Sequence, residues 1–345
     1  MRNSDQLMRQ RFGAQLLTQR PDPCVDSAVD VVRHLLAVQA QDPRGMRLSI
    51  RPRCPGSTRS DVDAALNDGS LVVGWLNRGT LHLVRAADYW WLHALTTPQL
   101  RTSNSRRLNQ EGVNGSDAKR AVGIIENQLK HQGVLTRSQI RELLKAAGIT
   151  TEGQALVHIL LRACIDGIAV RGPMVADHHA YVYAEEWLGA RPEVELDQAV
   201  AELAVRYLRG HGPADAPDLA KWAGITLTAA RRGFSQGVGI SQREDGLFIL
   251  ADAPAEVSKV PAPTLLGPFD PLLLGWRSRD SIVDVHRGII TTNGLFRAFA
   301  LVAGRAVATW RWVGGNVVLE PLEPISKRDL KMLDEEASDV VRFLT

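Results

Sequence analysis

Two glutamines stand two residues apart in the segment 38–43, which reads Val-Gln-Ala-Gln-Asp-Pro. Apolar residues at helical spacing predict a helix over 25–40, so we expect Gln39 in its last turn and Gln41 where the chain unwinds before Pro43. Both amides could then reach one small space. An amide has a donor end and an acceptor end, so a pair can fix the position and orientation of a water molecule. The plainer alternative is a pair of exposed glutamines at a helix end.

A second polar segment, 75–84, is expected to form a strand. On a strand, Arg78, Thr80 and His82 alternate with Gly79, Leu81 and Leu83. Side chains two residues apart share one face of a strand, so one face is polar and the other mostly apolar. The polar face either lines a cleft or points to solvent from a surface wing.

A third segment, 267–283, carries a basic pair. Asp270 precedes a proline and is expected in a turn, while Arg277 and Arg279 project two positive charges. Their alternative interpretation is a solvated loop. The formal net charge of the whole chain is only +3, which is compatible with a nucleic-acid partner but not diagnostic of one.

Several kinds of site are excluded by spacing. No Cys-x-x-Cys or His-Glu-x-x-His pattern is present, so no metal site is expected, and His178 and His179 are interpreted as part of a surface wing. No glycine-rich nucleotide fingerprint is present, so no cofactor is expected. The three cysteines Cys24, Cys54 and Cys164 imply no disulfide framework. Without a secretory signal or an apolar run long enough to span a membrane, we expect a cytoplasmic protein.

The predicted elements repeat along the chain. Three helices, the third from near Thr58 to Asn67, precede a β-rich ribbon, and this is the order of elements in a winged helix. The same order returns twice, separated from the first unit by a polar stretch at 101–117 that is expected to be a loop. The sequence therefore predicts an α+β fold with tandem winged-helix (helix-turn-helix) units over 1–100, 117–187 and 196–260.

In the last part of the chain, 261–345, apolar residues recur at every second position and no longer at helical spacing. Turn pairs at Asn293-Gly294, Ala303-Gly304 and Gly314-Gly315 separate alternating apolar runs between 284 and 320, which predicts a four-stranded antiparallel β-meander. A final helix is expected over 326–343.

Four of these segments, in this order, resemble the AlkZ-like winged-helix DNA glycosylases, which include the YcaQ-type proteins. The matching motifs are Gln39-Ala40-Gln41, then Arg78 to His82, then Phe-Asp-Pro…Gly-Trp-Arg-x-Arg from Phe269 to Arg279, and lastly Asn-Gly-Leu-Phe-Arg through Ala-Thr-Trp-Arg over 293–311. Many relatives carry Gln-apolar-Asp at the first motif. The glutamine at 41 instead resembles the branch linked to self-resistance against DNA-alkylating natural products.

The resemblance implies a C-shaped arrangement around double-stranded DNA and a monofunctional mechanism without a lyase step. It implies Gln39 and Gln41 as catalytic residues, and N7-alkylguanine or related cationic adducts as substrates, including interstrand crosslinks. On such a fold we predict a monomer, a cleft lined by Arg78, Thr80 and His82, and DNA contacts from Arg51, Arg53, Arg277, Arg279 and Arg297.

Two other classes of function remain open from the sequence. Winged helices are more often found in transcriptional regulators than in enzymes, although no separate ligand-sensing domain is evident here. A DNA-binding protein that shields adducts without cleaving them would also fit. Release of a free base distinguishes a glycosylase from both.

Overall fold

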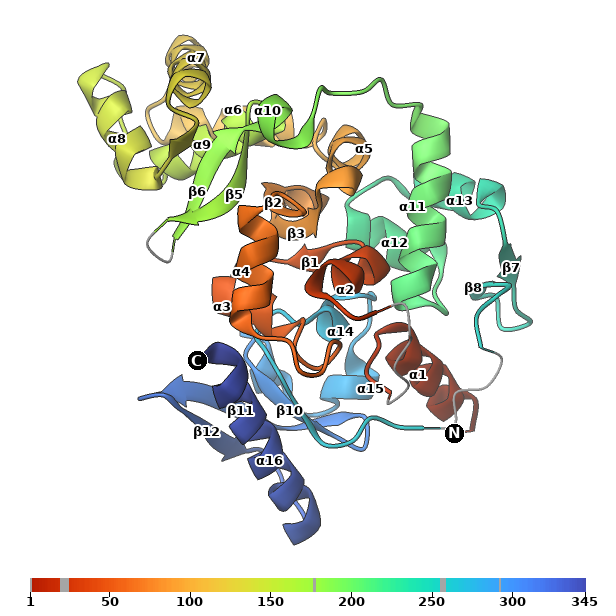
Figure 1. Ribbon diagram of the computed structural model, residues 1–345. Helices are drawn as coiled ribbons and strands as arrows, with labels where there is room; N and C mark the ends of the chain where they lie inside the picture. Colours follow the sequence, from red (N-terminus) through yellow and green to blue (C-terminus); the bar gives the residue numbers. More distant parts are fainter. Residues whose placement is uncertain (1, 19–24, 176–177, 255–258, 292) are drawn as a thin grey trace. The chain divides into compact units, whose positions relative to one another are not determined.

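The computed structural model describes residues 2–18, 25–175, 178–254, 259–291 and 293–345. The chain groups into two compact units, Met1–Val62 with Val200–Thr345, and Asp63–Ala199 (Figure 1). Both mix helices with antiparallel strands, in agreement with the α+β prediction. Within the described ranges, no helix is both long and apolar enough to cross a membrane. The thiols of Cys54 and Cys164 are buried and unbridged, and Cys24 lies outside the described residues.

The first unit begins with four short elements: α1 (Arg2–Ala14), α2 (Ala28–Leu35), β1 (Val38–Gln39) and α3 (Pro43–Leu48). Ser27 caps α2 by accepting a hydrogen bond from the Asp30 amide. The helix predicted over 25–40 ends early, because Leu36 adopts a φ of +67° and the chain then extends. α4 (Arg59–Asn67) follows near the predicted Thr58 start, where the hydroxyl of Thr58 bonds the Asp61 carboxylate.

The second unit contains five antiparallel strands in the order β3-β2-β5-β6-β4. The ribbon predicted at 69–84 is a hairpin, but it lies in the core, since every residue of β2 is buried. Residues 176–177, between β5 and β6, lie outside the described residues. The strands are β2 (Leu71–Trp75), β3 (Leu81–Arg85), β4 (Val134–Leu135), β5 (Ala169–Val175) and β6 (His178–Tyr183).

Helices surround this sheet, and one of them replaces a predicted loop. The polar stretch from residue 101 forms α6 (Leu100–Gln110), because Asn104 and Leu108 lie one turn apart and are buried. Asn104 also donates a hydrogen bond to the His158 carbonyl of α9. The other helices are α5 (Ala86–Thr96), α7 (Gly115–Gln132), α8 (Arg137–Ala146), α9 (Ala155–Ile165) and α10 (Ala184–Leu188).

The chain then forms three helices and a small hairpin, the order predicted for 196–260. These elements are α11 (Leu196–His211), α12 (Ala216–Ala223), α13 (Leu227–Gln236), β7 (Ile240–Gln242) and β8 (Phe248–Leu250). Asp215 and Asp218 form a capping box at the start of α12. The division into three winged-helix units stays a prediction.

A four-stranded antiparallel sheet, ordered β12-β11-β10-β9, closes the first unit. The predicted turns at Ala303-Gly304 and Gly314-Gly315 are confirmed by positive φ at both residues of each pair. The first predicted strand, before 293, is wrong: β9 comes from Thr264–Leu266, and short helical segments fill the interval. The elements are β10 (Phe299–Val302), β11 (Arg305–Val313), β12 (Asn316–Pro321), α14 (Pro271–Leu274), α15 (Asp280–Val283) and the 3-10 turn Arg287–Ile289.

The predicted final helix is α16 (Lys327–Leu344), capped by Ser326. It packs across this sheet, against β9 and β12 (Figure 1).

Candidate active site

The two glutamines lie in the short connection between α2 and α3. Gln39 is the second residue of β1 and is buried, and Gln41 is exposed at the bend before α3. The prediction that Gln39 sits in a helical turn is therefore wrong. The strand ends at Gln39 and the chain bends at Gln41, so the two side chains differ in exposure although they are only two residues apart.

Asp42 fixes the end of this segment. Its Oδ1 accepts a hydrogen bond of 2.6 Å from the Gly45 amide, so Asp42 caps the first turn of α3, and Pro43 occupies the following position. The helix then rests directly on a second segment, because a Cβ on Gly45 would lie 2.3 Å from the Pro268 carbonyl oxygen. A glycine at 45 is thus required for α3 to approach residues 267–268.

A groove of about 680 Å³ opens beside α3. Three arginines line it against two carboxylates, and both carboxylates already have partners: Asp42 caps α3, and Glu320 is bound by Arg311 and Thr309. For Arg44 and Arg297, no carboxylate partner exists in the part of the chain that the structure describes. The groove is lined by Asp42, Arg44, Leu48, Pro268, Arg297, Ala298, Thr309, Trp310, Arg311, Trp312 and Glu320.

Aromatic side chains form one wall of this groove. Trp310 is buried and donates its indole N–H to the Leu266 carbonyl at 2.9 Å. Trp312 is only half-buried, and the guanidinium of Arg44 lies 6.0 Å from its ring centroid. Sequence reasoning missed this wall, although Trp310 and Trp312 stand two residues apart on one strand and therefore share a face.

The second polar segment belongs to the other unit. Only His82 lies on β3; Arg78 sits in a 3-10 turn (Asn77–Gly79) with a φ of +56°, and Thr80 follows it. The predicted alternation of Arg78, Thr80 and His82 on one strand is therefore wrong, because the chain turns before β3 begins.

His82 is held in its neutral form. Burial, together with the positive charge of Arg78, lowers the pKa of His82 to about 3. Its Nδ1 lies 3.0 Å from the Thr80 carbonyl oxygen, which can only accept, so the ring proton is on Nδ1. His82 therefore carries no positive charge at neutral pH and cannot act as a cationic contact.

Comparisons with known proteins identify the family of the chain. The family model described as "DNA glycosylase AlkZ-like" matches residues 32–343. The chain belongs to the AlkZ-like DNA glycosylases. It is 27% identical to the "Interstrand DNA cross-link repair glycosylase" of Streptomyces sahachiroi, over 98% of this chain and 95% of that protein. The solved structure of Streptomyces sahachiroi DNA glycosylase AlkZ has the same fold, with a TM-score of 0.77, 24% identity and coverage of 98% and 96%.

Two arginines that were predicted to bind DNA are structural in this AlkZ-like enzyme. Arg51 is 2% exposed and donates to Glu336, Asp339 and the Leu265 carbonyl. Arg53 forms a bidentate ion pair with Asp270, 2.8 Å for each bond, and both side chains are fully buried. The prediction of DNA contacts from Arg51 and Arg53 is wrong, because neither guanidinium reaches the surface.

The Phe-Asp-Pro…Gly-Trp-Arg motif of the AlkZ-like enzyme is also largely structural. Asp270 caps α14 in addition to binding Arg53, and the Trp276 indole donates to the His211 carbonyl at 2.9 Å. The alternative of a solvated loop is wrong at these two positions. Only the end of the motif reaches the surface.

The remaining predicted contacts differ in how available their charges are. Arg277 is exposed but pairs with Asp215 and Asp218. Arg279 is half-buried against the Phe296 ring, and burial lowers its pKa. Arg297 is exposed and lines the groove, which makes it the most available of the three.

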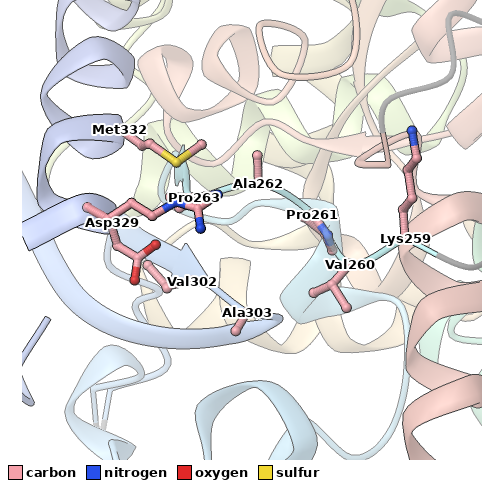
Figure 2. Close-up of a pocket in the computed structure, with 10 residues that line it drawn as sticks. Lys259, Val260, Pro261, Ala262, Pro263, Val302, Ala303, Asp329 and Met332 are labelled. Atoms are coloured by element: carbon pink, nitrogen blue, oxygen red, sulfur yellow. The ribbon is translucent and has the colours of Figure 1, made fainter. Parts of the chain in front are cut away.

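A second hollow, of about 360 Å³, lies between residues 259–263, the β10–β11 turn and the start of α16 (Figure 2). None of the predicted site residues line it. Across the described residues, no group of three or more histidine, cysteine or acidic side chains is arranged to hold a metal ion.

The buried pair gives a first prediction. Arg53→Met leaves the Asp270 carboxylate buried without its partner, so the free energy of unfolding should fall by about 3–5 kcal/mol, measured by chemical denaturation. The control is Arg311→Met, which breaks an exposed pair with Glu320 and should cost less than about 1 kcal/mol. Equal losses in the two variants would contradict the structural role of Arg53.

Proposed function

We propose that this DNA glycosylase hydrolyses the N-glycosidic bond of bulky alkylated purines, above all N7-alkylguanine adducts, in double-stranded DNA. The observation that carries the proposal is the placement of Gln39 and Gln41 in the connection that runs into α3, beside a groove lined by exposed arginines. The crosslink-repair activity named for the Streptomyces relative supports extending the substrates to interstrand crosslinks. Self-resistance to a DNA-alkylating natural product is the role that we propose.

Two neutral amides suffice for this reaction because of the chemistry of the substrate. An N7-alkylated guanine is a cation, so it leaves without being protonated, and the sugar acquires oxocarbenium character. The enzyme then needs an oriented water molecule and fixed dipoles near C1′, and preorganised dipoles of this kind are worth a few kcal/mol. A glutamine amide accepts a hydrogen bond from the water, and the proton passes to solvent.

The groove beside α3 suits a large lesion. Glycosylases that extrude a base hold it in a snug pocket, whereas this groove is open and about 680 Å³ in volume. Arg297 is the exposed cation of this groove that is available for a phosphate of a DNA strand. We propose that the winged-helix units hold the duplex, and that the enzyme acts as a monomer.

The glutamines give a second prediction. Gln39→Ala and Gln41→Ala should each lower single-turnover excision of N7-methylguanine by roughly 10- to 1000-fold, because each removes an oriented dipole. Duplex binding should change little. Release of free base by the unaltered enzyme excludes a regulator and an adduct shield, and near-normal excision by the double variant would remove these residues from the mechanism.

The groove gives a third prediction. Arg297→Ala should weaken binding to all duplexes alike and reduce the slope of log affinity against log salt by about one, since one phosphate contact is lost. Arg328→Ala, an exposed arginine at the hollow of Figure 2, is the matched control and should keep the parent slope. An unchanged slope for Arg297→Ala would place the DNA elsewhere.

A further inference from the structure

We propose that Trp312 and Arg44 form a stacking site for a planar ring carried by the alkyl group of the adduct. The inference rests on the proposed glycosylase function and concerns which adducts the same site prefers. Trp312 and Arg44 would determine specificity, whereas the glutamines position the water that attacks the bond.

The separation of this pair is close to that needed for an inserted ring. The Arg44 guanidinium lies 6.0 Å from the centroid of the Trp312 indole, at the outer limit of about 6 Å for a cation–π contact. A flat ring in contact with both layers needs about 7 Å between them, because carbon atoms pack at roughly 3.5 Å. Arg44 is exposed, so a small outward movement of its flexible side chain opens the gap.

The surroundings favour a ring over a phosphate at this position. Trp312 is half-buried in β11, where it is in register with Val317, so the indole is fixed by the sheet. A phosphate bound by Arg44 would leave the apolar face of the indole uncovered. An aromatic ring on the adduct covers the indole face on one side. On its other side the ring has the positive charge of Arg44 over its π system, so both the stacking and the cation–π contact are favourable.

The position of Arg44 connects this pair to the reaction. Arg44 follows Gln41 by three residues, and Asp42 holds the first turn of α3 that carries it. When the sugar C1′ of the damaged nucleotide lies at the glutamines, a substituent on N7 of its guanine can therefore reach the groove that Trp312 lines. The groove is far larger than the methyl group of a simple lesion requires.

Two duplexes test this inference, one with N7-methylguanine and one with N7-benzylguanine. Stacking on one ring is worth about 1–3 kcal/mol. Trp312→Leu should therefore lower the rate of N7-benzylguanine excision by about 5- to 100-fold, measured at enzyme concentrations that do not saturate the duplex. Excision of N7-methylguanine should stay within about twofold. The benzyl excision rate of Trp312→Phe should lie between those of the parent and Trp312→Leu. Arg44→Gln should lower only excision of N7-benzylguanine, whereas Arg328→Gln should lower excision of neither adduct.

Binding is measured on the same two adducts with a 2′-fluorinated sugar, which resists loss of the base. Wild type should bind the benzyl duplex more tightly than the methyl duplex, and Trp312→Leu should remove that preference. The ratio of the two affinities tests the stacking site even if the enzyme releases no base. Failure to release base would contradict only the proposed function. Equal losses on both adducts in Trp312→Leu and Trp312→Phe, or no loss on either, would overturn the inference.

Discussion

The ion pair between Arg53 and Asp270 holds together the parts of the first unit that form the site. All five N–H groups of the guanidinium have partners: two go to Asp270, two to Gln15 and one to the Ser49 carbonyl. A fully buried charge pair is tolerated only when its polar groups are satisfied in this way. The pair therefore joins α1, the end of α3 and the start of α14 at one point.

Contacts between neighbouring segments connect this ion pair to the candidate site. Gly45 allows α3 to lie against Pro268, and that contact places Arg44 beside β11. Arg51 connects the same segment to α16 and β9 through Glu336, Asp339 and the Leu265 carbonyl. The glutamines precede α3 directly, so the segment that carries them is anchored at its far end by buried charges.

Local signals in the sequence predicted local structure well. The paired turn residues at 303–304 and 314–315 act within a few residues, and both turns were confirmed. The final helix was also confirmed, and Ser326 caps it. The end of α2 was missed because Leu36, a residue with no preference for positive φ, occupies a left-handed conformation. α6 was missed because its sequence is mostly polar. Only Asn104 and Leu108 are buried, which is too few for a visible helical pattern.

Partners that are far apart in sequence could not be predicted in the same way. Arg53 meets a carboxylate 217 residues away, and Arg51 meets one 288 residues away, so periodicity gives no sign that either charge is buried. The same distance hid β9, which supplies the fourth strand from before the predicted meander. The catalytic role of the glutamines was predicted by resemblance, while the strand at Gln39 and the bend at Gln41 emerged only from the fold.

We propose that two neutral amides position the water and that no neighbouring carboxylate removes its proton. Asp42 is the carboxylate adjacent to Gln41, and its Oδ1 caps α3. Asparagine caps a helix as well as aspartate does, so Asp42→Asn preserves the fold and removes only the charge. We predict that single-turnover excision of N7-methylguanine by Asp42→Asn stays within about threefold of the parent rate. A loss of about 100-fold or more, the range for a missing general base, would contradict the claim.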